Sequence, residues 1–144
     1  MNAPTRNPRF CLQCDDGTVL EYGTWDARGD LHGEAYEVRA VTGWHCPKCG
    51  EIEFAEGEGK RHNAAIETAR RAAEKRRAAE LRAIRKKLGL TQAEAGRLFG
   101  GGATAFSAYE HCKTQPHKST VLLLRVLGKH PELLNEVIKE AHPA

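Results

Sequence analysis

The fold of this chain is decided by residues 91–110, TQAEAGRLFGGGATAFSAYE. Thr91 stands directly before an apolar helical pattern and Glu94 follows three residues later, which is the pattern of a capping box at a helix start. We expect a first short helix whose buried face is made of Ala93, Ala95, Leu98 and Phe99. Gly100, Gly101 and Gly102 should end it, because glycine enters left-handed backbone conformations without a Cβ clash.

A second short segment follows the three glycines. Phe106 and Tyr109 lie three residues apart on one face, and the other faces carry Thr104, Ser107, Ala108 and His111. Two short helices joined by a glycine turn are typical of a DNA-binding helix-turn-helix, whose second helix enters the major groove. The alternative is an ordinary helical hairpin within a helical domain.

Charge is distributed unevenly along the 144 residues. Residues 1–56 carry a net charge of −5, residues 57–90 carry +7 and residues 91–144 carry +1. This distribution indicates separate modules with different partners. The chain has no apolar run of about 18 residues and no apolar core in its first ten residues, so we expect a cytoplasmic protein without a membrane span or secretory signal.

Four of the five cysteines form two C-x-x-C pairs, Cys11 with Cys14 and Cys46 with Cys49. In a reducing cytosol this pattern favours metal binding over disulfides. Four thiolates suit one tetrahedral zinc ion per chain and leave no open position, so the zinc should be structural. A redox dithiol and a tetrathiolate iron site remain alternatives. His45 is the only histidine placed to compete as a ligand, and we expect Cys112 to be a bystander thiol.

Around the cysteines, residues 19–22 and 35–41 are predicted strands, and residues 26–30 are predicted to be the turn between them. Residues 1–60 should therefore form a small zinc-bound, β-rich (α+β) module that owes much of its folding free energy to the ion. The predicted core residues are Trp25, Tyr36 and Trp44, although aromatic side chains of this kind are also enriched at partner interfaces.

Residues 61–80 are predicted to be a basic helical connector that follows a hinge at residues 57–59, within a helix predicted from His62 to Leu88. Residues 81–144 should form an all-α helix-turn-helix domain, with a strongly apolar helix from Ser119 to Gly128 and a last helix from Pro131. That apolar helix needs more than one neighbour, and a second subunit would cover part of it. The basic side chains are either a solvated face or phosphate contacts from Arg85, Lys86, Lys87 and Lys118.

Two stretches carry a family resemblance. Residues 88–127 resemble the Xre-type helix-turn-helix domains of bacterial and phage repressors. The two C-x-x-C pairs ahead of FGGGATAFSAYE and KHPELLNE resemble the MqsA family of antitoxins. The resemblance implies a zinc-bearing N-terminal domain that blocks a small mRNA-cleaving toxin. It also implies a C-terminal domain that forms a homodimer, binds palindromic operator DNA and represses its own operon.

The resemblance also suggests which residues touch DNA. Family members commonly read bases with an asparagine and an arginine, and the aligned residues here are Thr104 and Ala108. A different operator or a weaker specificity is therefore expected. Gln92 matches a phosphate-bonding position. The full expected set is Gln92, Ala103, Thr104, Ser107, Ala108, His111 and Lys113.

Two other functions stay open. The chain could be a zinc-containing helix-turn-helix regulator without a toxin, or a small iron electron carrier fused to a DNA-binding domain. An enzyme is not expected and no catalytic residue is predicted, because the sequence has no paired carboxylates, no nucleophile–base constellation and no nucleotide loop.

Overall fold

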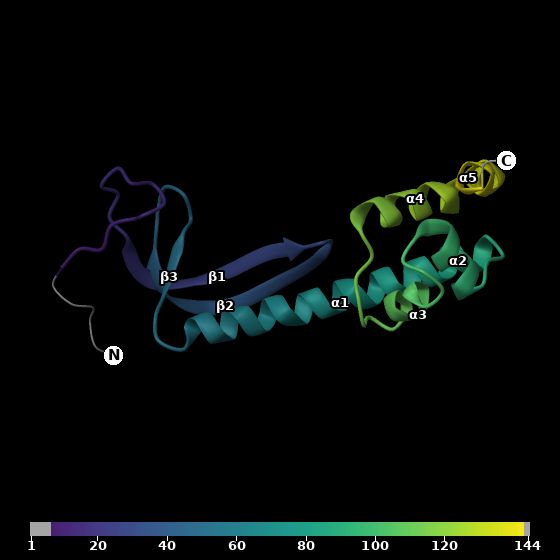
Figure 1. Ribbon diagram of the computed structural model, residues 1–144. Helices are drawn as coiled ribbons and strands as arrows, with labels where there is room; N and C mark the ends of the chain where they lie inside the picture. The colour runs from purple at the N-terminus through teal and green to yellow at the C-terminus, as the bar shows by residue number, and fades with distance from the viewer. Residues whose placement is uncertain (1–6, 143–144) are drawn as a thin grey trace. The chain divides into compact units, whose positions relative to one another are not determined.

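The computed structural model describes residues 7–142 and divides into two compact units, residues 1–71 and 72–144 (Figure 1). The predicted boundaries were 60/61 and 80/81, so the division falls inside the predicted connector. One uninterrupted helix, α1 (Glu58–Lys87), contributes residues to both units.

The first unit is built on a three-stranded antiparallel sheet in the order β1 (Glu21–Leu31), β2 (Glu34–His45), β3 (Ile52–Phe54). The β1–β2 turn is at His32 and Gly33, with φ angles of 55° and 87°. Two successive positive φ angles are what a type I′ hairpin turn requires.

The turn predicted at residues 26–30 is wrong, because these residues lie inside β1. The pairing register shifts between Trp25 and Ala27, and the Asp26 carboxylate accepts a hydrogen bond of 2.9 Å from the backbone N–H of Ala40. The aspartates and glycine that suggested a turn therefore accompany a β-bulge and the strand that follows it.

The core of the first unit is made of smaller side chains than we predicted. Val38 and Val41 are buried, together with Leu20 beside the cysteines. Trp25, Tyr36 and Trp44 are only half-buried. Trp44 packs against the cluster of Cys11, Leu20 and Cys46, as predicted, whereas Trp25 and Tyr36 belong to no buried cluster of the described residues. The Trp25 ring lies on its own strand over Gly23 and stacks on His45 at 4.8 Å. Tyr36 contacts the ring of His62 on α1 at 5.9 Å, and the Arg9 guanidinium lies 3.7 Å from the centre of the Trp44 ring.

The start of α1 is fastened to β2. The predicted hinge is the point where the chain enters the helix: Gly57 has φ 83°, and Gly59 is already helical. The Glu58 carboxylate accepts bonds from the backbone N–H of Thr42 and from the Arg61 guanidinium, at 3.2 and 2.6 Å. Arg61 also donates to the carbonyl oxygens of Arg39 and Ala40, at 2.6 and 2.8 Å.

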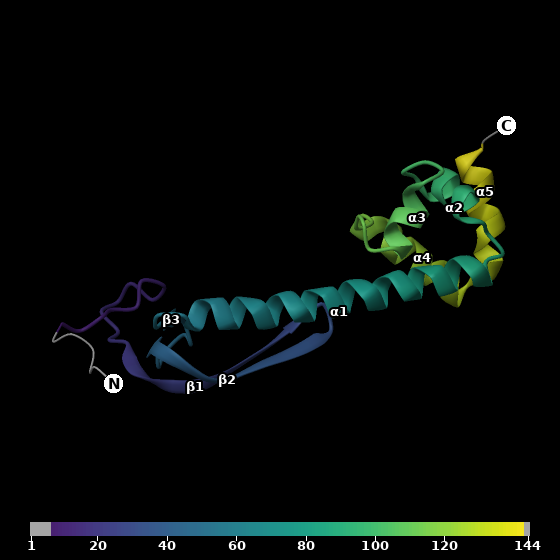
Figure 2. The same ribbon diagram turned by 90° about the horizontal axis from the view of Figure 1, so that it is seen from below.

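The second unit packs four elements around the C-terminal part of α1 (Figure 2). They are α2 (Gln92–Phe99), α3 (Ala105–Glu110), α4 (Lys118–Lys129), and the pair formed by the short helix η1 (Pro131–Leu133) and α5 (Leu134–Ala141). Four of the helices each contribute one residue to the buried cluster, namely Leu81, Ala95, Phe106 and Leu124. The apolar helix predicted from Ser119 to Gly128 is α4, which extends one residue further at each end. The last helix, predicted from Pro131, begins with the 3₁₀ turn η1.

The predicted capping box is confirmed. The backbone N–H of Glu94 donates to the Thr91 hydroxyl at 3.2 Å, and the backbone N–H of Thr91 donates to the Glu94 carboxylate at 2.7 Å. Gly100, Gly101 and Gly102 have φ angles of 98°, 89° and 84°, as expected for a turn that needs glycine. The start of α2 and the turn that separates it from α3 are therefore set by the capping box and the three glycines.

Gly96 is the point of closest approach between α2 and the glycine turn. A Cβ atom on this residue would lie 1.9 Å from the carbonyl oxygen of Gly102. We expect Gly96→Ala to destabilise the second unit by about 1–3 kcal/mol, measured by urea unfolding, because the turn must move away from α2.

Gly59→Ala is the matched control, because its Cβ would make an ordinary contact at 3.7 Å with Phe54 inside a helix. We expect unchanged stability or a gain of up to about 1 kcal/mol. Equal unfolding midpoints for the two variants would contradict the tight approach at Gly96.

Candidate functional site

The four paired cysteines converge on one point in the first unit. Cys11 and Cys14 precede β1, and Cys46 and Cys49 lie between β2 and β3. All four sulfur atoms lie within 4.8 Å of one another, with 3.6 Å between Cys11 and Cys49 and 3.8 Å between Cys14 and Cys46. A tetrahedron of sulfurs at about 2.3 Å from a zinc ion has edges of about 3.8 Å. The cluster therefore has the geometry to hold one metal ion.

The two C-x-x-C segments form the same turn. In each turn, the residue that follows the second cysteine donates its backbone N–H to the carbonyl of the first. Asp15 donates to Cys11 at 3.1 Å, and Gly50 donates to Cys46 at 3.0 Å. The N–H groups of Cys14 and Cys49 point at the first sulfur of their own pair, each at 3.5 Å. The two turns thus direct their sulfurs toward the same point.

The pKa values of the clustered thiols bear on whether all four can ionise together. Burial, together with hydrogen bonds to the other three sulfurs, raises the pKa of Cys14 to about 12. The backbone N–H of Cys49 is the main cause that lowers the pKa of Cys46 to about 7. Four adjacent thiols cannot all ionise near neutral pH without a compensating positive charge, and a metal ion supplies it. His45 stacks on Trp25 and is not part of the cluster.

In the second unit, the residues predicted to face DNA lie on an accessible surface at α3. Ala103 and Thr104 are exposed ahead of the helix, and the Thr104 hydroxyl makes no capping bond. Ser107 and Ala108 are half-buried, and the remaining predicted residues, His111 and Lys113, are exposed. Ala105 and Phe106, which lie between Thr104 and Ser107 in the sequence, are buried. Thr104, Ser107, Ala108 and His111 have the spacing of one helical face, and Ala103 and Lys113 flank them along the chain.

Arg85 and Gln92, both predicted to contact phosphates, donate hydrogen bonds to the carboxylate of Glu110. The Arg85 guanidinium binds both carboxylate oxygens of Glu110, at 2.5 and 3.1 Å, and donates to the carbonyl of Leu90 at 2.8 Å. Gln92 donates to the same carboxylate at 2.9 Å. The Arg85 side chain is 10% exposed and that of Glu110 is 3% exposed. The predicted phosphate contact by Arg85 is therefore wrong, because the charge of Arg85 is buried in an ion pair with Glu110 that joins α1 to α3.

Glu110 is the residue that sequence reasoning missed. Its carboxylate is buried, yet its pKa is held below the ordinary value, because the bonds from Arg85 and Gln92 outweigh the burial that acts in the opposite direction. The available signal was an acidic residue at the end of a short helix whose preceding turn is apolar.

Residues 9–138 match the family described as the antitoxin component of a bacterial toxin-antitoxin system, MqsA. The chain is 39% identical to the Antitoxin MqsA of Escherichia coli (strain K12) over 129 residues, which cover 88% of this chain and 98% of that protein. The chain belongs to the MqsA antitoxin family. Membership implies a toxin partner and a regulatory role.

Two surfaces of this MqsA-family chain carry side chains that the fold leaves uncovered. Around the cysteine cluster the exposed apolar residues are Phe10, Leu12 and Val19, and Leu12 is 92% exposed. On the second unit the exposed apolar residues are Leu122, Leu123, Val126, Leu133 and Ile138. Among the residues that the structure describes, no helix is both long and apolar enough to cross a membrane.

The remaining predicted phosphate contacts stay accessible. Lys86, Lys87 and Lys118 are all exposed, and Lys87 donates to the carbonyl of Gly128 at 2.5 Å.

Proposed function

We propose that this antitoxin neutralises an mRNA-cleaving toxin through its first unit and represses its own operon by binding operator DNA through its second. The observation that carries the DNA-binding half is the placement of the predicted base-facing residues. Thr104, Ser107, Ala108 and His111 have the spacing of one helical face. Ala105 and Phe106, which lie between Thr104 and Ser107 in the sequence, are buried and hold the helix against the core. A short helix held this way presents its outer face to a groove.

The metal is proposed to be zinc, one structural ion per chain. Four cysteine sulfurs with the edge lengths of a tetrahedron fill every ligand position, so none is left for a reactive water. Metal analysis of the purified protein should give one zinc per chain and no visible absorbance. A coloured protein that contains iron would overturn this assignment.

The toxin is proposed to dock on the first unit near the cysteines. An almost fully exposed leucine, Leu12, lines the same surface hollow as Glu51 and Glu53, and residues 1–56 carry a net charge of −5. An apolar anchor with an acidic surround suits a basic, RNA-cleaving partner. Purification of the chain from its native host should bring with it a second small protein that cleaves mRNA. A chain that purifies alone would favour a zinc-containing regulator without a toxin.

Sequence-specific DNA binding is tested at Thr104. Its exposed hydroxyl and methyl can both meet a base edge, whereas alanine keeps only a methyl. We expect Thr104→Ala to relax base preference at one position of each half-site by about 1–3 kcal/mol. Selection from randomised duplexes measures this. A base preference identical to that of the wild type would move the reading role elsewhere on α3.

The homodimer is proposed to form through the exposed apolar face of α4. Leu122 and Val126 lie four residues apart and Leu123 lies three before Val126, so the three share one helical face. Val126→Asp should place a charge in that interface, yield a monomer in analytical ultracentrifugation and weaken operator binding. Leu12→Asp is the control and should leave the dimer intact. A Val126→Asp dimer of wild-type stability would place the interface on another surface.

A further inference from the structure

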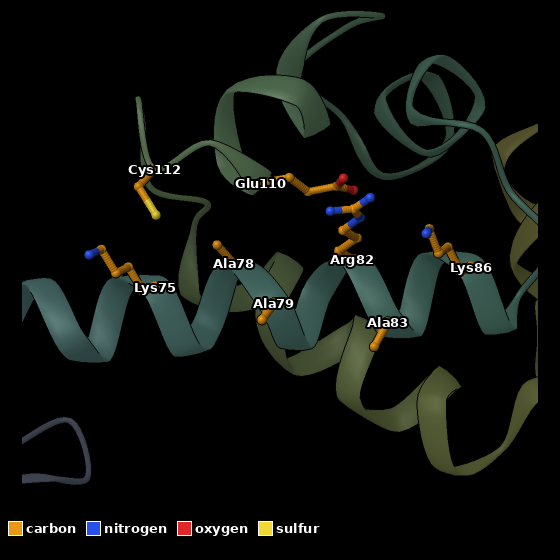
Figure 3. Close-up of a pocket in the computed structure, with 8 residues that line it drawn as sticks. All are labelled: Lys75, Ala78, Ala79, Arg82, Ala83, Lys86, Glu110 and Cys112. Carbon is orange, nitrogen blue, oxygen red and sulfur yellow. The ribbon is translucent and has the colours of Figure 1, made fainter.

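The second unit contains a hollow of about 390 Å³ between α1 and the end of α3 (Figure 3). Three cationic side chains from α1 line it: Lys75, Arg82 and Lys86. Their spacings of seven and four residues place them along one face of the helix. The hollow is therefore a positively charged groove along α1, open to solvent.

The three cations of the hollow are accessible to solvent. Lys75, Arg82 and Lys86 are exposed. The Arg82 guanidinium points toward the Glu110 carboxylate (Figure 3), and its charge is one of the causes that lower the pKa of Glu110. Glu110 is the single carboxylate in the lining, and both of its oxygens are occupied by Arg85, with Gln92 as a further donor. With three cations and one carboxylate in its lining, the hollow has a net positive charge.

The shape of the hollow admits a compact anion. Its α1 side is floored by three small side chains, Ala78, Ala79 and Ala83, which let a ligand approach the helix closely. The opposite side is formed by Glu110 and by Cys112, whose φ of 56° turns the chain away after α3. Cys112 lies between His111 and Lys113, so the hollow adjoins the surface that we propose for base reading.

We propose that this hollow binds a phosphate group of the DNA backbone next to the bases that α3 reads. The inference rests on the proposed DNA binding and names its sequence-independent contact. Arg82 supplies a planar guanidinium that can bind two phosphate oxygens, and Lys75 and Lys86 supply charges on either side. The site takes the place of the contact first expected from Arg85, whose charge is already paired with Glu110.

The test measures DNA affinity against salt for Arg82→Ala and Lys86→Ala, on a promoter duplex and on a random duplex. Each lost phosphate contact should lower the slope of log affinity against log salt by about 0.9, and should weaken both duplexes by the same factor. Lys60→Ala removes an equal, exposed charge from the first unit and should leave the slope unchanged.

The two ways of failing are distinguishable. If the wild-type chain binds DNA with a salt slope and Arg82→Ala keeps that slope, the hollow is not a phosphate site, although DNA binding stands. If the wild-type chain shows no salt-dependent binding, the proposed repressor function fails and the phosphate site fails with it.

Alkylation of Cys112 in the wild-type chain provides a second readout that does not depend on a variant folding. The Cys112 thiol lines the hollow, so bound duplex DNA should slow its reaction with iodoacetamide, while inorganic phosphate at the same ionic strength should not. Protection by inorganic phosphate but not by DNA would show a site for free small anions and overturn the proposal. Equal reactivity with and without bound DNA would overturn it as well.

Discussion

Replacing Cys46 by serine is expected to unfold the first unit while α2 to α5 remain folded. Cys46 is fully buried, and its sulfur lies 3.8 Å from that of Cys14 on the opposite C-x-x-C turn. Beside the cluster the unit buries few apolar side chains, mainly Leu20, Val38 and Val41. A structural zinc ion contributes on the order of 10–16 kcal/mol in small zinc domains, which exceeds the stability of such a sheet.

The measurement combines metal analysis with hydrogen exchange along the chain. Cys46→Ser should lose its metal and its protection over β1 to β3, and a chelator should produce the same pattern in the wild-type protein. Cys112→Ser is the matched control, because this thiol lies outside the cluster and its loss should leave the metal bound. Retention of the metal by Cys46→Ser, or collapse of the second unit along with the first, would contradict the account.

Removing the Glu110 carboxylate is expected to be the most damaging single change in the second unit. Glu110→Ala leaves the Arg85 guanidinium buried without its counter-charge and the Gln92 amide without its acceptor. Breaking one side of a buried ion pair costs about 3–5 kcal/mol. The midpoints of thermal and urea unfolding of the second unit should therefore fall strongly in Glu110→Ala. Glu110→Gln restores a neutral acceptor, so its midpoints should lie between those of Glu110→Ala and those of the wild type.

Acid should reproduce part of this effect. The pKa of Glu110 is lowered in the folded chain from an ordinary value of 4.5. A group whose folded pKa is depressed adds stability above its unfolded pKa, and that stability is lost as the pH falls through the folded pKa. Below pH 4.5 the wild-type second unit should lose stability that Glu110→Gln does not have to lose.

Glu80 provides the comparison for Glu110. Its carboxylate binds the Arg125 guanidinium at 2.8 and 2.9 Å, but both side chains are more than a third exposed. Exposed pairs contribute up to about 1 kcal/mol, so Glu80→Ala should have a small effect. If Glu80→Ala and Glu110→Ala cost the same, the burial of Glu110 would not be the source of its stabilising effect.

Features set by local chemistry could be predicted from the sequence. The capping box at Thr91, the glycine turn and the two C-x-x-C turns each depend on short-range spacing, and the structure shows all three. The family could likewise be predicted from short motifs. These features define the two candidate sites.

Features that depend on distant partners could not be predicted. The role of Arg85 is set by Glu110, which lies 25 residues away along the chain. Residues 26–30 have the composition of a turn, yet pairing with β2 extends them through a bulge. The cationic hollow brings together α1 and the end of α3, so no linear pattern marks it. In each case the tertiary neighbour decided the outcome.

The most direct test of the central claim is hydrogen exchange of the full chain with and without its promoter duplex at low salt. The account predicts that DNA slows exchange over α3 and the residues around it, 103–113, and leaves the cysteine turns and the sheet of the first unit unchanged. DNA-dependent protection confined to the first unit, or no protection anywhere, would contradict it.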